Sequence, residues 1–286
     1  MITQFKHHFT HPVIAIGHSI GGLELIQLSL IHPTLFTSLI LLDPVLVSNP
    51  ADGNAFALPA FTLKRPQILP SRDIARIGFS NAFKRWDPRV LDLFMEYGLR
   101  DRKNNDGKGE VEMIVGRYPE LSGYIRTPHM QGRDESTLSK DMDDIEWTRQ
   151  IIRVYASMKT IAPSTLILAG GNSVTSRKEV REDWEKNYGS NDDFRNPGQR
   201  RNVVVDVIEN GSHFFPFDDP KDVASRTGKW IESMVDENSV FAKEKKSVRE
   251  WRALKFEEKE QYIEGWMGEQ KVKLFSAMKK HKKSKL

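Results

Sequence analysis

The strongest chemical signal in the sequence is a serine between glycines. Ser19 occupies the centre of a Gly-x-Ser-x-Gly pattern at residues 17–21, after the apolar run 13–16 and before apolar residues at helical spacing. A strand, a sharp turn and a helix in this order expose a serine hydroxyl above the end of a sheet, with the positive helix N-terminus beneath any negative charge that develops there. Small residues on both sides allow the strand and the helix to approach each other. The pattern predicts that Ser19 is a nucleophile.

A histidine late in the chain is the candidate base for this serine. A serine hydroxyl becomes a good nucleophile only when a neighbouring base takes its proton. His213 follows the apolar run 202–208 in a loop that contains a glycine and a proline, and it comes after the serine in the chain. The other histidines lack this setting, and we expect His18 to point away from the site and His32 to cap a helix. His213 is therefore the predicted general base.

The order of these motifs resembles that of the α/β-hydrolase superfamily. Three further stretches are similar to segments of that family, namely 39–44, 165–170 and 211–216. The chain also resembles a narrower group, the fungal peroxisomal α/β-hydrolases of toxin-biosynthesis clusters, because it ends in Ser284-Lys285-Leu286. The resemblance implies an α/β fold with a mostly parallel sheet. It also implies a serine esterase or thioesterase that acts on a small acyl substrate, with no cofactor and no metal ion.

The resemblance gives two places for the acid that orients the histidine. Many relatives carry it after the strand that corresponds to 165–169, but residues 170–173 of this chain contain no carboxylate. The other place follows the preceding strand, where Asp43 ends an apolar run. Asp43 is the predicted third member of the triad, and a strand-end aspartate that only caps the next turn is the alternative. Asp183 and Asp192 are the remaining candidates.

The resemblance also implies two donors for the negative charge on a reacting carbonyl oxygen. One is the backbone N–H of Ile20, the residue after the nucleophile. The other comes in the family from a loop near the start of the domain, and only eighteen residues precede Ser19 here. We therefore expect that loop and the first four strands to be missing, so that the sheet is truncated at its N-terminal half. Two functions stay open: a serine hydrolase, or a non-catalytic hydrolase remnant that binds a partner or has no activity.

The rest of the sequence predicts how these residues are positioned. Two apolar runs with a helix between them predict one right-handed β-α-β unit over 13–43. A polar, glycine-containing stretch at 101–109 predicts an exposed loop. The expected regions are a discontinuous α/β-hydrolase core, a mainly helical cap and a basic helical tail, at 1–48 with 160–236, 49–159 and 237–286 respectively.

Composition and charge limit the partners. The chain has no cysteine, which excludes disulfides and thiol catalysis. The net charge of +4 lies largely toward the C-terminus without a nucleic-acid-binding pattern, so no nucleic-acid partner is expected. No apolar run has the length of a membrane span. Ser284-Lys285-Leu286 at a true C-terminus is recognised by the peroxisomal import receptor, which predicts a peroxisomal location.

Overall fold

The computed structural model describes residues 9, 12–48, 57–124, 146–190, 202–235, 253, 255 and 258. The chain forms two compact units, residues 1–231 and 232–286. Almost all described residues belong to the first unit. The predicted targeting residues Ser284, Lys285 and Leu286, and nearly all of the predicted tail 237–286, lie outside the described residues.

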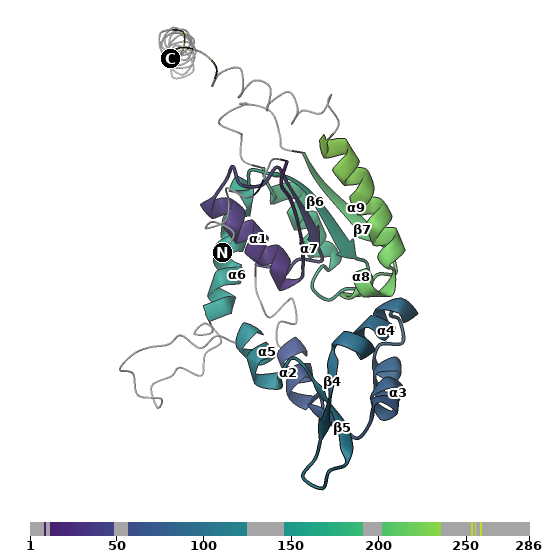
Figure 1. The fold of residues 1–286 in the computed structure, drawn as a ribbon. Helices are drawn as coiled ribbons and strands as arrows, with labels where there is room; N and C mark the ends of the chain where they lie inside the picture. The colour runs from purple at the N-terminus through teal and green to yellow at the C-terminus, as the bar shows by residue number, and fades with distance from the viewer. Residues whose placement is uncertain are drawn as a thin grey trace, which may run out of the picture. The chain divides into compact units, whose positions relative to one another are not determined.

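The first unit contains a four-stranded parallel sheet (Figure 1). Its strands follow the order β1-β2-β6-β7 and comprise β1 Ile14–His18, β2 Ser38–Leu42, β6 Ser164–Gly170 and β7 Val203–Ile208. The register pairs Gly17 with Leu41, Leu41 with Ile167, and Gly170 with Ile208. The β-α-β unit predicted for 13–43 is confirmed. Because the strands are parallel, their carboxyl ends meet at one edge, where α/β sheets carry their ligand sites.

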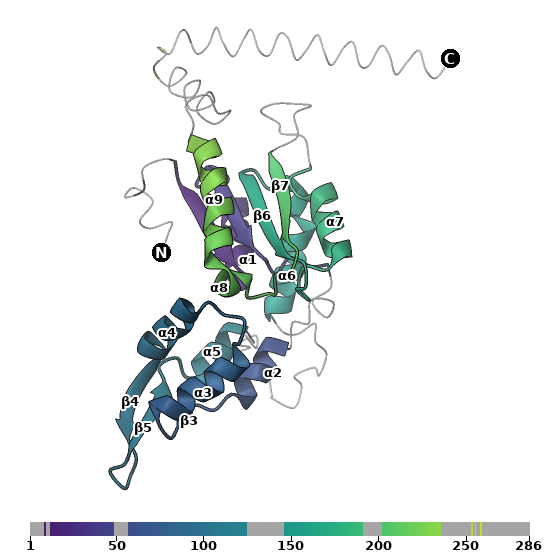
Figure 2. The same ribbon diagram turned by 90° about the vertical axis from the view of Figure 1, so that its right-hand side faces the viewer.

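Helices cover both faces of this sheet (Figures 1 and 2). One face packs against α1 Ile20–Ile31, α6 Glu146–Ala156 and α7 Lys178–Asn187, in a core that includes Leu23, Ile26, Leu39, Leu41, Ile151, Val154, Ile167, Ala169 and Trp184. On the opposite face lies α9 Pro220–Val235, whose Trp230 indole N–H donates to Ser38 Oγ at 2.8 Å. Side chains alternate along a strand, so Ser38 and Leu39 point to opposite faces. Burial on both faces explains why β2 and β6 are continuous apolar runs.

Residues 57–124 form four helices and a second, antiparallel sheet of order β3-β5-β4. These elements are α2 Ala57–Lys64, β3 Ile68–Leu69, α3 Arg72–Ala82, α4 Pro88–Tyr97, β4 Leu99–Lys103, β5 Gly109–Met113 and α5 Arg117–Tyr124. The mainly helical cap expected at 49–159 stays a prediction. The loop predicted for 101–109 is wrong in part, because β4 continues through Lys103 and the turn occupies only 104–108.

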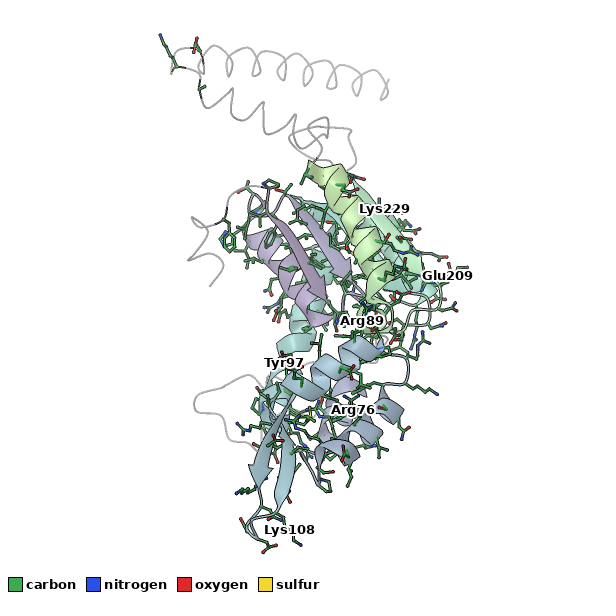
Figure 3. The ribbon with its side chains drawn as sticks, turned by 45° about the vertical axis from the view of Figure 1, so that its right-hand side comes forward. Arg76, Arg89, Tyr97, Lys108, Glu209 and Lys229 are labelled. Carbon is green, nitrogen blue, oxygen red and sulfur yellow. The ribbon has the colours of Figure 1, made fainter. Side chains whose placement is uncertain are left out.

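Charged residues on the hairpin explain why its sequence resembles that of a loop. β4 and β5 are joined across the ladder by ion pairs of Arg100 with Glu112 and of Arg102 with Glu110. Only one face of the hairpin is apolar, where Val111 is buried against α3 and α4. The turn at its tip carries Lys108 (Figure 3). Cross-strand pairing of opposite charges stabilises such strands even where the sequence is too polar to suggest one.

Two short helices complete the described elements of the first unit, the 3₁₀ turn Met158–Thr160 and α8 Phe215–Asp218. No pattern in the sequence predicts α8, which lies between His213 and the last described helix of the core, α9. Within the described ranges, no helix has both the length and the apolarity that crossing a membrane requires.

Candidate active site

β1 passes into α1 through a turn of one residue, Ser19. β1 continues to His18, beyond the predicted apolar run, and α1 begins at Ile20. Ser19 has φ 56° and ψ −122°, a backbone conformation that strains a residue with a side chain. Its N–H donates to the carbonyl of Leu42 on β2 at 3.0 Å. The backbone therefore holds the Ser19 hydroxyl above the carboxyl end of the sheet.

The glycines of the turn have different roles. A Cβ on Gly17 would lie 2.7 Å from the carbonyl oxygen of Gly21 and 2.8 Å from Leu25 Cδ1, and a Cβ on Gly22 would lie 3.0 Å from Pro44 Cβ. A Cβ on Gly21 would meet nothing within 4 Å. Gly17 is therefore required by the close approach of strand and helix. The expectation that both flanking residues must be small is wrong for Gly21.

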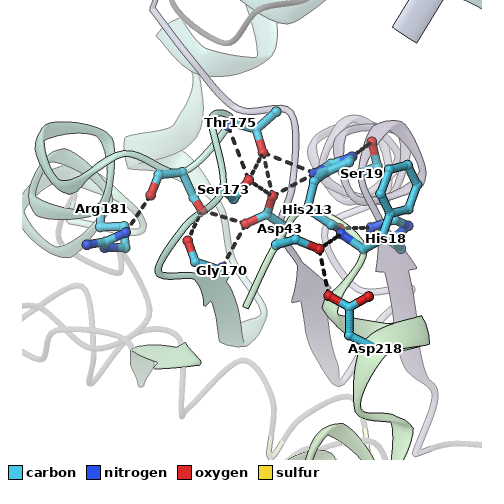
Figure 4. Close-up of polar contacts among 12 residues, drawn as sticks. His18, Ser19, Asp43, Gly170, Ser173, Thr175, Arg181, His213 and Asp218 are labelled. Carbon is cyan, nitrogen blue, oxygen red and sulfur yellow. Dashed lines mark hydrogen bonds and ion pairs between the residues drawn. The ribbon is translucent and has the colours of Figure 1, made fainter. Parts of the chain in front are cut away.

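Ser19, His213 and Asp43 meet at the sheet edge from three separate parts of the chain (Figure 4). His213 Nε2 lies 2.9 Å from Ser19 Oγ, and His213 Nδ1 lies 2.7 Å from Asp43 Oδ2. The Asp43 side chain is fully buried, and that of His213 is 10% exposed. One ring nitrogen thus contacts the candidate nucleophile and the other contacts the acid, which is the geometry of a Ser-His-Asp triad.

Two glycines at the end of β6 allow the His213 loop to approach the sheet. A Cβ on Gly170 would lie 2.7 Å from the carbonyl oxygen of Ser212, and one on Gly171 would lie 2.1 Å from that of Glu209. The atoms in the way belong to the backbone, so they cannot rotate aside. The end of β6 therefore positions the loop that carries His213, although residues 170–173 contain no carboxylate.

Asp43 lies directly after β2 in a left-handed backbone conformation with φ 46°. Aspartate tolerates this region better than most residues with a side chain. Its N–H donates to the carbonyl of Leu168 on β6 at 2.8 Å. The strand end therefore turns the carboxylate inward, beneath the imidazole of His213.

Five hydrogen-bond donors surround the Asp43 carboxylate, namely His213 Nδ1, the backbone N–H of Gly170, and the hydroxyls of Ser173, Thr175 and Ser176. Burial raises the pKa of Asp43, but the hydrogen bonds from His213, Gly170 and Ser173 and the charge of His213 outweigh it, so that the pKa lies below its ordinary value. Asp43 is therefore ionised and can stabilise a positive charge on His213.

Sequence reasoning missed these three hydroxyls. Their one signal is position, because Ser173, Thr175 and Ser176 follow the strand after which many relatives carry the acid. No short motif links them to Asp43, which lies more than a hundred residues earlier. We refer to Ser173, Thr175 and Ser176 below as the hydroxyl cluster.

His18 contributes to the site, although the sequence analysis expected it to point away. Its Nε2 lies 2.8 Å from the backbone carbonyl oxygen of His213, and the two imidazole rings are 4.9 Å apart. The ring also packs edge-on against Phe217 of α8. Burial lowers the pKa of His18 below its ordinary value, which keeps the ring neutral. A neutral His18 donates through Nε2–H and ties β1 to the His213 loop.

Asp183, the other acid candidate among the described residues, has partners other than His213. Asp183 on α7 accepts hydrogen bonds from the Tyr155 hydroxyl and from Asn187 Nδ2, each at 2.6 Å. Asp192 lies outside the described residues. Of the three aspartates considered from sequence, the structure brings Asp43 to His213.

The predicted oxyanion donor Ile20 is the first residue of α1. An N–H in the first turn of a helix has no acceptor within the helix, and it is free for a ligand. The expected absence of a second oxyanion donor is not tested by the described residues and stays a prediction. Within the same ranges, no group of three or more histidine, aspartate or glutamate side chains could hold a metal ion.

A segment between α3 and α4 contacts the loop that carries His213. Arg85 lies 3.3 Å from Asp218 Oδ2, and Trp86 stacks on Phe217 with the ring centroids 4.9 Å apart. The N–H of Asp87 donates to the carbonyl of Phe217 at 2.8 Å. Residues 85–87 thus pack against α8, which follows His213 closely in the chain.

A parallel sheet with a serine on a strained strand–helix turn, and with a histidine and an acid at the same edge, defines the α/β-hydrolase class. The model of the alpha/beta hydrolase family matches residues 2–226. This chain belongs to that family, and its parallel sheet and the helices on both faces form the α/β-hydrolase fold.

Individual relatives agree with this assignment. Abhydrolase domain-containing protein AFT2-1 of Alternaria alternata is 29% identical over 90% of this chain and 96% of its own length. Type I acyl-CoA thioesterase mpaH of Penicillium roqueforti is 27% identical, over 82% of this chain and 62% of its own length. Among solved structures, peroxisomal alpha-beta-hydrolase Lpx1 of Saccharomyces cerevisiae shares the fold with a TM-score of 0.58 at 16% identity, covering 95% of this chain and 66% of Lpx1. The chain thus spans less than two thirds of the thioesterase and of Lpx1.

Proposed function

We propose that this protein is a serine hydrolase that cleaves an ester or a thioester of a small acyl substrate. The observation that carries the proposal is the pair of contacts made by one imidazole, 2.9 Å from Nε2 to Ser19 Oγ and 2.7 Å from Nδ1 to Asp43 Oδ2. A strained serine turn costs folding free energy, and such strain persists mainly at functional sites.

The geometry supports a two-stage acyl transfer. His213 Nε2 takes the Ser19 proton while Oγ bonds to the substrate carbonyl carbon, and the carbonyl electron pair moves to oxygen. The Ile20 N–H and the N-terminus of α1 stabilise that oxyanion. The oxyanion then collapses, the bond to the alcohol or thiol breaks, and the leaving group takes the proton from His213. In the second stage, His213 takes a proton from water, whose oxygen bonds to the acyl carbon. The bond from that carbon to Ser19 Oγ then breaks, Oγ takes the proton from His213, and the acid leaves.

Asp43 supports both stages without gaining or losing a proton. An ionised, buried carboxylate holds Nδ1–H and stabilises the imidazolium that forms each time His213 accepts a proton. The lowered pKa of Asp43, which hydrogen bonds maintain against burial, fits this role. A thioester is the favoured substrate because a relative carries the name of an acyl-CoA thioesterase.

Hydrolysis of activated acyl esters and of acyl thioesters tests the proposal. We expect the wild type to release product above the background rate, and Ser19→Ala to reduce kcat by roughly a thousandfold or more. His32→Ala, a change at the C-terminal cap of α1, is the matched control and should keep the wild-type rate. If the folded wild type hydrolyses no faster than Ser19→Ala, the enzyme proposal fails and the non-catalytic remnant is favoured.

We also propose a peroxisomal location and a role in fungal toxin biosynthesis. The location is suggested by the Ser284-Lys285-Leu286 tripeptide and by the peroxisomal relative of the same fold, and the role by resemblance to fungal toxin-cluster hydrolases. A fluorescent protein fused before residue 1 should accumulate in peroxisomes, and removal of the tripeptide should release it. An unchanged distribution after removal would contradict the proposed location. Gene deletion followed by metabolite analysis tests the role.

A further inference from the structure

The hydroxyl cluster contacts the acid on both carboxylate oxygens. Ser176 Oγ lies 2.5 Å from Asp43 Oδ1, next to the Gly170 N–H at 2.9 Å. Ser173 and Thr175 donate to Oδ2, the oxygen that also accepts from His213. An ionised carboxylate offers about four lone-pair sites and has no proton to donate. Together with His213 Nδ1 and the Gly170 N–H, the hydroxyl cluster therefore provides hydrogen-bond donors for all lone-pair sites of the Asp43 carboxylate.

Thr175 differs from the two serines because it contacts the base as well as the acid. Its Oγ1 donates to Asp43 Oδ2 and lies 3.1 Å from His213 Nδ1 (Figure 4). Ser173 Oγ accepts from the backbone N–H of Thr175 at 3.2 Å, which holds the two hydroxyls next to each other. Ser173 and Thr175 are buried, at 5% and 6% exposure, so water does not replace these contacts.

The hydrogens available at this point define what Thr175 can do. The ionised Asp43 only accepts, so Nδ1, which lies 2.7 Å from Oδ2, carries a hydrogen, and the hydroxyls of Ser173 and Thr175 have one hydrogen each. With its hydrogen on Oδ2, Thr175 presents a lone pair to Nδ1–H. The imidazole is then held in the tautomer with Nδ1 protonated, which leaves the Nε2 lone pair free to accept the Ser19 proton.

Resting on the proposed hydrolase function, we propose that Thr175 is a positioning residue for the triad. It fixes the Asp43 carboxylate and His213 Nδ1 relative to each other, and Ser173 holds it in place. The charged or titratable groups around it are few among the described residues. They are Asp43 after β2, His213 and, through its ring contact with His213, His18 of β1. Arg181 of α7 donates to the Ser176 carbonyl at 2.6 Å.

Substituting the hydroxyl without changing the shape tests the proposal. Thr175→Val removes the donor and should lower kcat/KM roughly tenfold to a hundredfold, the loss expected for one hydrogen bond to a charged group. The acid limb of its pH–rate profile should move to higher pH, because Asp43 loses a donor to its ionised form. Thr175→Ser keeps the hydroxyl and should restore both the rate and the profile.

Thr165→Val is the matched control, because Thr165 is also buried, on β6, and its hydroxyl contacts Pro163 and Tyr188 instead of the triad. If Thr175→Val retains the wild-type rate and pH profile, the proposal is wrong. It is also wrong if Thr175→Ser loses as much as Thr175→Val, because the position would then be sensitive to packing alone.

A second measurement does not depend on activity. The Nδ1–H proton of His213, observed by NMR in folded Ser19→Ala protein, should give a strongly downfield signal that Thr175→Val shifts and Thr175→Ser preserves. An identical signal in both variants would overturn the positioning role. Because Ser19→Ala has no nucleophile, this result separates failure of the positioning role from failure of the hydrolase function.

Discussion

The two ends of the triad are held by different means. Ser19 is positioned by the backbone, through its strained φ of 56° and the contact of Gly17 with α1. Asp43 is positioned largely by side-chain hydroxyls that surround its carboxylate. The nucleophile end therefore tolerates no added volume at Gly17, whereas the acid end tolerates no loss of hydrogen-bond donors. The first end depends on adjacent residues, and the second depends on residues far away in the chain.

Asp43→Asn should have the largest effect at the acid end. The neutral amide cannot stabilise the imidazolium. Its NH₂ group would also face donors that, in the wild type, bond to a carboxylate oxygen. By analogy with triads in which this change selects the wrong histidine tautomer, kcat should fall about ten-thousandfold. Measurement of kcat at saturating substrate checks this, with Asp183→Asn as the control, since Asp183 bonds Tyr155 and Asn187.

A double variant sharpens the same comparison. Ser173 follows β6, contacts Asp43 Oδ2 and occupies the stretch where many relatives carry the acid. Ser173→Asp added to Asp43→Asn should place a carboxylate near Nδ1 and recover part of the lost kcat. If folded protein shows no recovery of kcat, the loop after β6 can bind the carboxylate of Asp43 but cannot replace it with a carboxylate of its own.

The nucleophile end should respond to a single methyl group. Gly17→Ala places Cβ 2.7 Å from a backbone oxygen, so strand and helix must separate. We expect a loss of about 1–3 kcal/mol in the free energy of unfolding, typical of overpacking. Gly21→Ala, which meets nothing within 4 Å, is the matched control. Urea unfolding compares the two, and equal stability would contradict the packing argument.

His18 should give a smaller, pH-dependent effect. Its pKa is lowered in the folded state, so the unfolded state binds more protons below about pH 6.5. The folded protein therefore loses stability as the pH falls from this value toward the lowered pKa. His18→Gln keeps an N–H donor without a titrating ring, so its free energy of unfolding should fall less between about pH 8 and pH 5. His32→Gln is the control, and an unchanged pH dependence in His18→Gln would refute this account.

The sequence predicted those parts of the fold that neighbouring residues in the chain determine. The strands at 38–42, 164–170 and 203–208 and the strand–turn–helix around Ser19 follow local patterns of apolar residues and glycines, and the structure contains them. The hairpin of β4 and β5 was missed because paired charges, rather than an apolar pattern, join its strands.

The same distinction applies to the site. Ser19 and His213 could be named from motif and order, whereas the acid was one choice among three aspartates. The hydroxyl cluster and the contact of His18 with His213 could not be predicted, because they form only when loops distant in the chain fold together. The role of Gly170 and Gly171 depends in the same way on the backbone of residues 209–212.

Covalent labelling by a fluorophosphonate probe tests the central claim most directly. The claim is that His213, held by Asp43, activates Ser19 as a nucleophile. Intact-mass measurement and peptide mapping should find one adduct, on Ser19, in the wild type, no adduct in Ser19→Ala, and much slower labelling in His213→Gln. Folded wild type that stays unlabelled, or an adduct that persists in Ser19→Ala, would contradict it.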